Sequence, residues 1–210
     1  CGPLEVSEVR MPRAIFIGQE LPISLIARDV SGCNCTPRIV GSVGDPILSS
    51  RFAMEVCDCC EDCRCIDPGY EAAEVQPPPP FGEHRVPIGG LMPRILSVRD
   101  RESCRPDATP TGLRIERPTD LVRSGPALTW AVITIETTLC CAEPMYVVES
   151  YRTRPTTTTL ELAVYDCTPE VACACDPTPT SFEAWHSLGE LSPGAYTVRA
   201  GGVEQTFTIE

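Results

Sequence analysis

The sequence predicts an all-β protein with two β-domains in tandem, and three observations support this prediction. The chain of 210 residues is long enough for two domains of roughly 100 residues each. Its 22 prolines and 15 glycines disfavour long helices and favour short elements joined by turns. Apolar residues recur at a period of two in many short stretches, which is the pattern of strands with one buried face.

Each half of the chain contains about seven such stretches. The predicted strands of the first half cover residues 4–10, 21–29, 38–43, 52–57, 70–75, 94–99 and 112–116. Those of the second half cover residues 121–123, 128–137, 145–151, 158–166, 182–186, 195–200 and 204–209. Seven alternating strands separated by turn signals are typical of an immunoglobulin-like sandwich. We therefore expect one such domain over residues 1–118 and a second over residues 119–210.

Three matches between the halves indicate an internal duplication. The stretch GQELPISLIARDVSGC at 18–33 aligns with GPALTWAVITIETTLC at 125–140, and LMPRILSVR at 91–99 aligns with LSPGAYTVR at 191–199. The spacing CxxxxxCxC occurs twice, at Cys57, Cys63 and Cys65 and at Cys167, Cys173 and Cys175. The first half also carries extra residues in the proline-rich segment 75–90, which we expect to be extended or looped.

The stretch LSPGAYTV resembles the corner-and-strand pattern of bacterial immunoglobulin-like and fibronectin type III domains. In those families a tyrosine at the position of Tyr196 caps the turn into the penultimate strand. The resemblance implies the same role for Tyr196 here. In the first half Ile95 or Leu96 replaces the tyrosine, so the corner hydrogen bond is not expected there.

The cysteines form two groups. Alternating strand directions would bring the first group to one pole of the first domain, where an even number suits four disulfides: Cys33, Cys35, Cys57, Cys59, Cys60, Cys63, Cys65 and Cys104. The second group is Cys140, Cys141, Cys167, Cys173 and Cys175. Because that number is odd, one of these is free, paired with the first domain or paired with another chain. The adjacent residues Cys140 and Cys141 are the first place to look, since neighbours bond to each other only with strain.

Metal binding is the alternative use of this sulfur. The run CDCCEDCRC resembles the thiolate-rich runs of metallothioneins, which would make Cys57, Cys59, Cys60, Cys63 and Cys65 ligands for copper or zinc. Disulfides are the favoured prediction, because a secreted chain lies in an oxidising compartment where thiols pair. A redox-active pair Cys60–Cys63 is less well supported, since no thioredoxin-like context surrounds it.

The chain begins with Cys1, and in this it resembles a mature bacterial lipoprotein, whose first cysteine carries acyl chains. The resemblance implies a membrane anchor at Cys1 and a location in the bacterial cell envelope, anchored in the outer membrane and facing the periplasm or the cell surface. The alternative is that the chain simply starts at this residue. No apolar run approaches the roughly 18 to 20 residues that span a bilayer as a helix.

Composition and motifs also limit the function. A net charge of −12 disfavours nucleic acid as a partner. The two histidines, His84 in the proline-rich segment and His186 beside Trp185 on a strand edge, belong to no catalytic motif, and no cofactor is expected. His84 would lie in a mobile segment, where it could contribute to a metal site.

We expect a non-catalytic envelope lipoprotein with a structural or protein-binding role, self-assembling or contributing to a larger surface assembly. The alternative is a periplasmic copper- or zinc-binding protein.

Overall fold

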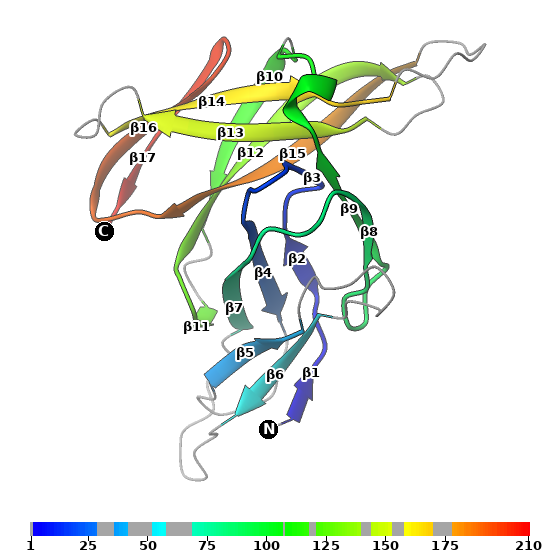
Figure 1. Cartoon of the computed structure of the whole chain (residues 1–210). Helices are drawn as coiled ribbons and strands as arrows, with labels where there is room; N and C mark the ends of the chain where they lie inside the picture. The colour runs from blue at the N-terminus through cyan, green and yellow to red at the C-terminus, as the bar shows by residue number, and fades with distance from the viewer. Residues whose placement is uncertain are drawn as a thin grey trace.

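The computed structural model describes residues 2–28, 36–41, 52–57, 69–106, 108–117, 121–139, 144–152, 158–169 and 178–210. This part of the chain is all-β, with one short 3₁₀ turn, η1 (Arg101–Ser103), between strands (Figure 1). Its several sheets are consistent with β-sandwiches, so the predicted fold class is confirmed at that level. The same residues include no helix with the length and apolar character needed to cross a bilayer.

The first half of the chain builds three sheets around one core. Its strands are β1 (Gly2–Leu4), β2 (Glu8–Arg10), β3 (Ala14–Phe16), β4 (Leu21–Ala27), β5 (Thr36–Val40), β6 (Ala53–Cys57), β7 (Gly69–Gln76), β8 (Gly82–Val86) and β9 (Arg94–Arg99). The sheets have the orders β11-β7-β4-β2, β3-β9-β8 and β1-β6-β5, where β11 (Leu121–Ser124) comes from later in the chain. Leu25 of β4 and Ala72 of β7 lie opposite each other and face the core.

The second half forms two sheets around a second core. Its strands are β10 (Pro110–Glu116), β12 (Leu128–Leu139), β13 (Tyr146–Arg152), β14 (Thr159–Asp166), β15 (Thr178–Glu190), β16 (Gly194–Ala200) and β17 (Val203–Ile209). They pair in the orders β10-β12-β15 and β13-β14-β16-β17. Ala131 and Ile133 of β12 are fully buried in this core together with Val198 of β16.

The two halves share one scheme of strand pairing. Three antiparallel neighbours form one sheet in each half, β2-β4-β7 and β10-β12-β15. In the second half, β14 pairs in parallel with β16 and so joins two antiparallel pairs into one sheet. In the first half the antiparallel pairs β5-β6 and β8-β9 are joined by a single parallel bridge between Phe52 and Ile88. By position in this scheme, β8 corresponds to β16 and β9 corresponds to β17.

This correspondence differs from the sequence expectations in three respects. The match between residues 91–99 and 191–199 aligns β9 with β16, which occupy different positions in the scheme. The proline-rich segment 75–90 is extended at residues 82–86, as expected, but these residues form the paired strand β8, which was not among the predicted strands. In addition, β14 lies between β13 and β16. In an immunoglobulin sandwich the third strand lies directly beside the sixth.

The expected boundary after residue 118 falls between two strands that each pair with the opposite half. β10 was expected to end the first domain, but it pairs with β12. β11 was expected to open the second domain, but it pairs in parallel with β7, with Leu121 opposite Gly69. The chain therefore crosses between the halves three times from β9 to β12. β10 and β11 are thus exchanged between the halves. This exchange was not predicted, because local periodicity identifies a strand but not its neighbour.

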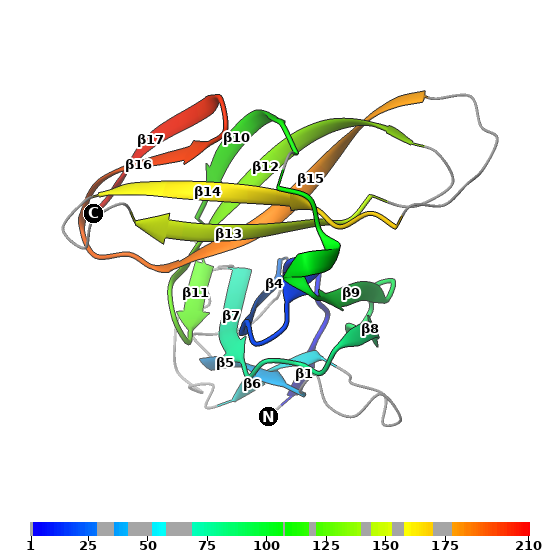
Figure 2. The same cartoon turned by 45° about the horizontal axis from the view of Figure 1, so that its top comes forward.

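The sheet β2-β4-β7 packs its outer face against the outer face of β10-β12-β15. Leu128 and Trp130 of β12 form a buried cluster there with Ala73 of β7, and the partly buried Trp185 of β15 packs against it. The two indole rings meet edge to face, with 6.3 Å between their centroids. Figure 2 shows the second half lying across the end of the first. Burial of this aromatic surface is a large apolar contribution to the contact between the halves.

Charged side chains are also buried at this contact, and each is paired. The side chain of Arg10 is 7% exposed, and it lies 2.7 Å from Glu8 and 3.3 Å from Glu116 of β10. Glu71 is buried 3.1 Å from Arg123 of β11. Burial raises the pKa of Glu71, although the charge of Arg123 opposes this shift. A buried charge left without its partner is strongly destabilising, so these pairs require β10 and β11 to be in place.

Gly125 lies where the chain between β11 and β12 passes against β7. Its φ is +79°, and a Cβ at this position would lie 1.9 Å from the carbonyl oxygen of Ala73. We expect Gly125→Ala to lower the free energy of unfolding by about 2 to 5 kcal/mol, because a left-handed backbone cost and a backbone clash add together. Urea denaturation followed by tryptophan fluorescence measures the loss.

Gly189→Ala is the matched control. Gly189 has a similar φ of +77°, but a Cβ there would meet no heavy atom within 4 Å. It should lose only the backbone cost of about 1 to 2 kcal/mol. Equal losses in the two variants would show that β7 does not constrain the chain at Gly125.

Candidate functional site

Most cysteines singled out from the sequence lie outside the described residues. These are Cys1, Cys33, Cys35, Cys59, Cys60, Cys63, Cys65, Cys140, Cys141, Cys173 and Cys175. Cys57 is the last residue of β6. Cys104 and Cys167 are described, and they form a disulfide bond across a sequence separation of 63 residues. The alternative metal cluster at 57–65 therefore stays a prediction, as does the shared pole of Cys33 and Cys57.

The assignment of Cys104 to the first-half set is wrong, because its partner Cys167 follows β14 of the second half. Figure 1 shows η1 beside the second half, whereas β6 ends near the far end of the first half. The error arose because β8 was not recognised as a strand. One missing strand reverses the inferred direction of β9, and with it the end at which Cys104 lies. The odd cysteine of the second half was expected to be free, paired with the first domain or paired with another chain. The second option is confirmed for Cys167, because Cys104 lies within the expected first domain, residues 1–118.

Arg101 lies in the segment that contains Cys104, and its side chain contacts both halves. Its guanidinium lies over the ring of Phe16 at 5.1 Å and over the ring of Tyr165 at 5.4 Å. It also forms an ion pair with Glu149 of β13. Because Phe16 belongs to β3 and Tyr165 to β14, this stacked arrangement joins the two halves beside the disulfide.

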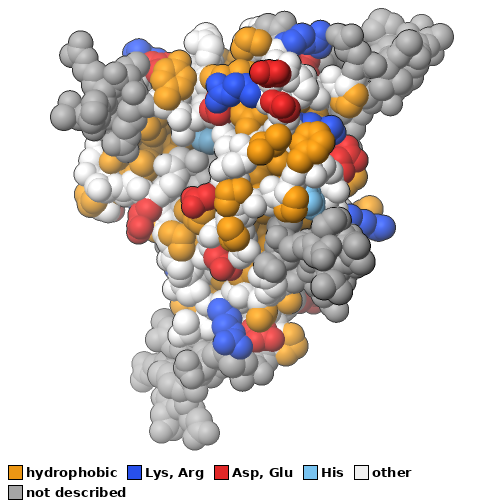
Figure 3. Space-filling model, in the orientation of Figure 1, with side chains coloured by type: hydrophobic (Ala, Val, Ile, Leu, Met, Phe, Trp, Pro, Cys, Tyr) orange, Lys and Arg blue, Asp and Glu red, His pale blue; other side chains and the backbone are white. Residues whose placement is uncertain are grey.

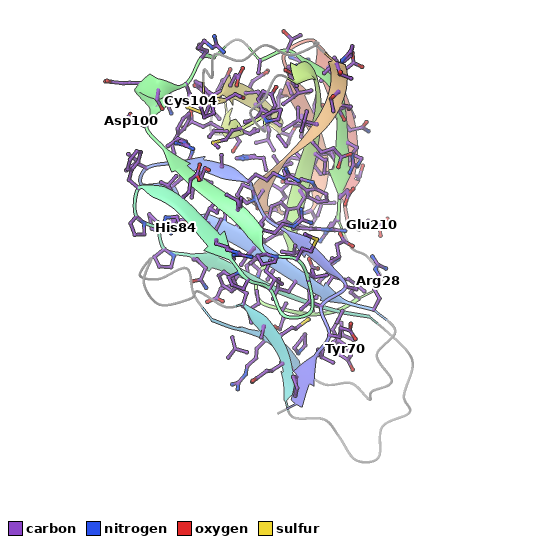
Figure 4. The ribbon with its side chains drawn as sticks, turned by 90° about the vertical axis from the view of Figure 1, so that its right-hand side faces the viewer. Arg28, Tyr70, His84, Asp100, Cys104 and Glu210 are labelled. Atoms are coloured by element: carbon purple, nitrogen blue, oxygen red, sulfur yellow. A yellow bond between two sulfur atoms is a disulfide. The ribbon has the colours of Figure 1, made fainter. Side chains whose placement is uncertain are left out.

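Backbone hydrogen bonds position the residues on each side of Cys104. Figure 4 shows Asp100 and Cys104 together at one end of the molecule. The Asp100 carboxylate accepts a 3.2 Å hydrogen bond from the Glu102 backbone and so caps η1. Arg105 and Asp166 exchange two backbone hydrogen bonds of 2.9 and 2.8 Å. The disulfide, the contacts of Arg101 and the backbone hydrogen bonds between Arg105 and Asp166 together form what is here called the junction.

His84 lies on β8, and the expectation of a mobile segment is wrong for this residue. Its side chain is buried, and Nε2 donates a 2.7 Å hydrogen bond to the carbonyl oxygen of Pro80. Leu96 of β9 lies opposite it in the sheet. A ring held in this way supports the fold, and metal ligation through Nε2 would break its hydrogen bond.

His186 lies beside Trp185 on β15, a strand at the edge of its sheet, as the sequence predicted. Its ring hydrogen-bonds the backbone of Val148, while Nε2 is shielded from solvent and has no hydrogen-bond partner among the described residues. Burial lowers the pKa of His186 to about 4, and this outweighs the opposing effect of the Val148 hydrogen bond. The ring is neutral near pH 7, so it is poorly suited to general acid catalysis there.

Tyr196 has the role that the resemblance implied for it. Its hydroxyl donates a 2.9 Å hydrogen bond to the carbonyl oxygen of Ser192 and so closes the turn before β16. Its ring stacks on Phe207 of β17 at 5.7 Å between centroids. The predicted tyrosine cap is confirmed at this position.

A groove, here called the seam groove, runs along the contact between the two halves. One cavity of about 770 Å³ is bordered by residues 8–13 of the first half and 181–185 of the second. An adjoining cavity of about 610 Å³ is bordered by residues 91–95 and by Pro144 and Met145. The cavities are continuous because they share the bordering residues Glu8, Val9, Arg13, Arg94, Ile95 and Pro144. Volumes of this order are typical of ligand-binding clefts.

Paired charges surround Trp185 in the seam groove. The guanidinium groups of Arg10 and Arg114 lie 5.7 and 5.8 Å from its ring. Arg114 also pairs with Glu116 at 2.8 Å and with Glu183 at 2.5 Å. The hydrogen bond from Arg114 lowers the pKa of Glu183, so this carboxylate stays ionised as the pH falls. Figure 3 shows arginines scattered singly among apolar and acidic side chains on one face of the molecule.

The seam groove was not predicted from the sequence, because its borders come from β2, β9, β10 and β15. No group of three or more His, Cys, Asp or Glu side chains in the described part of the chain is placed to hold a metal ion. The chain matches no family model, no curated protein and no solved structure. The functional conclusion therefore depends on the junction and on the seam groove.

Replacing both cysteines of the junction, Cys104→Ser with Cys167→Ser, should lower the free energy of unfolding by about 4 kcal/mol. This is the loop-closure entropy of a cross-link across 63 residues. The folded halves should stay in contact through β7-β11, so the tryptophan emission of the native state should not shift. Guanidinium denaturation of the double variant and the parent checks both points, and coinciding curves would contradict a stabilising role.

His186 should make the protein less stable in acid. Its pKa is lowered in the fold, so its contribution is complete above the unfolded value of about 6.5 and is lost as the pH falls toward 4. The loss should reach at most about 3 kcal/mol, since each pKa unit corresponds to about 1.4 kcal/mol. His186→Gln should remove this part of the pH dependence. Denaturation of both proteins between pH 8 and pH 4 tests it, and parallel stability curves would rule it out.

Proposed function

We propose that this chain is a non-catalytic protein of the bacterial cell envelope that acts as a rigid structural or protein-binding unit, by self-assembly or within a larger surface assembly. The observation that carries the proposal is the disulfide between Cys104 and Cys167, which joins the two halves. Such bonds form and persist mainly in oxidising compartments outside the cytoplasm. A cross-link between halves also favours a role that depends on their fixed arrangement.

The proposed fold is a tandem pair of immunoglobulin-like sandwiches modified by strand exchange. Two observations support this version: the strand-pairing scheme recurs in both halves, and Tyr196 closes its turn as in that fold class. The position of β14 beside β16 and the exchange of β10 and β11 are the modifications. Such sandwiches commonly present their surfaces and loops to protein partners.

The proposed anchor is a lipid on Cys1. Figure 1 shows the start of the chain at β1 on the side of the first half that faces away from the second half. An anchor there would hold the first half against a membrane and direct the second half and the seam groove outward. The environment of His84 supports a role without catalysis, because its ring is buried and hydrogen-bonded inside the fold.

Intact mass spectrometry of the protein isolated from membranes of producing cells tests this proposal. The chain contains no lysine, so the α-amino group is the only amine in the polypeptide. If Cys1 is acylated on its amine, an amine-reactive ester should add no mass, and the acyl chains themselves should appear in the mass. If the cysteines are oxidised, a thiol alkylating reagent should modify at most about two of them before reduction.

Two outcomes would contradict separate parts of the proposal. A free amine on a protein that is not membrane-bound would remove the anchor. Release of zinc or copper by a chelator, together with exposure of many thiols, would support the metal-binding alternative at 57–65 instead.

A further inference from the structure

We propose that the seam groove binds an extended polypeptide segment of a partner protein, with apolar side chains at alternate positions and at least one carboxylate. This inference rests on the protein-binding version of the function proposed above and names the class of partner. Three features of the groove carry it: two free sheet edges, an exposed apolar rim and an unpaired cation.

Two sheet edges that have no neighbouring strand within the described part of the chain border the groove. β2 is the terminal strand of the sheet β11-β7-β4-β2, and β15 is the terminal strand of β10-β12-β15. Residues 8–10 and 181–185 of these two strands border the same cavity. Among the described residues, no backbone hydrogen bond reaches the outer edge of β15 between residues 181 and 185. A free edge presents N–H and C=O groups, which an added strand satisfies.

The rim of the groove presents apolar side chains to solvent. Met92 is 86% exposed and Ile95 is 54% exposed, and both border the groove beside Pro93 and Pro144. Ile95 belongs to β9 and pairs with Arg85 of β8, so its position is fixed before any ligand arrives. Contiguous exposed apolar side chains mark sites where a partner is buried, and a rigid site loses little entropy on binding.

The charge of the occupant follows from Arg94. The acidic groups that border the groove already have partners, since Glu8 pairs with Arg10 and both Glu116 and Glu183 pair with Arg114. Arg94 is exposed, and no residue in the described ranges forms an ion pair with it. A carboxylate on the bound segment would be its complement, and an arginine–carboxylate pair fixes the register of a bound strand.

Selection from a library of random octapeptides displayed on phage tests the proposal without assuming a sequence. The parent protein is the bait, and Ile95→Ser is used for counter-selection. Enriched peptides should alternate apolar with other residues and contain Asp or Glu. Ile95→Ser should weaken the binding of a synthetic enriched peptide at least about tenfold, whereas Ile17→Ser should not change it. Ile17 is the matched control, because it is also 54% exposed but does not border the groove.

Two further measurements separate charge and backbone contributions. Arg94→Glu should weaken binding at least about tenfold, while Arg94→Lys should keep it within about threefold, because the charge is retained. N-methylation of alternate amides of the peptide should abolish binding for one set of positions and leave it nearly unchanged for the other. Only pairing with a strand edge produces this alternation.

Several results would overturn the proposal. The first is that no selected peptide prefers the parent over Ile95→Ser. The second is that Ile95→Ser and Ile17→Ser change peptide binding equally. The third is that methylation of neither set of peptide amides changes binding. Self-association that Ile95→Ser abolishes would make a second copy of this chain the occupant and would also overturn it. None of these results alters the thiol count or the amine test, so failure of the groove and failure of the envelope proposal are distinguishable.

Discussion

The packing of the β2-β4-β7 sheet against the β10-β12-β15 sheet is the constraint on which the rest of the structure depends. Trp130 and Trp185 make this contact largely apolar, yet it also encloses Arg10 and Glu71. Each of these charges needs a partner inside the contact. β10 supplies one through Glu116, and β11 supplies the other through Arg123. The strand exchange is therefore the means by which the interface neutralises its own buried charges.

The same contact explains why the seam groove is preformed. Its two walls belong to different halves, so the groove exists only while the halves keep one arrangement. On one side the halves are held by the disulfide at Cys104 and by Arg101, which stacks on Phe16 and Tyr165 and pairs with Glu149. On the other side they are held by the pairing of β11 with β7. A cleft with walls fixed in this way needs little reorganisation when it is filled, which favours binding.

The sequence was sufficient to predict local structure but not the relations between distant strands. Each predicted strand overlaps a strand of the fold, because apolar residues alternate along the sequence in stretches such as 128–137. β3 was missed because it is short and follows Pro12, and β8 was missed because prolines surround it. The partners of β10, β11 and Cys104 could not be predicted, since pairing depends on packing between the halves. The seam groove was missed for the same reason.

The junction at Cys104 also determines how the molecule would respond to mechanical load. If tension is applied between the ends of the chain, it passes from Cys104 to Cys167 through the sulfur atoms and bypasses the residues between them. β10 to β14 lie inside this covalent loop, so pulling cannot draw them out in line while the bond is intact. The residues inside the loop add no length to the stretched chain even if their strands come apart, which limits the extension of the protein under force.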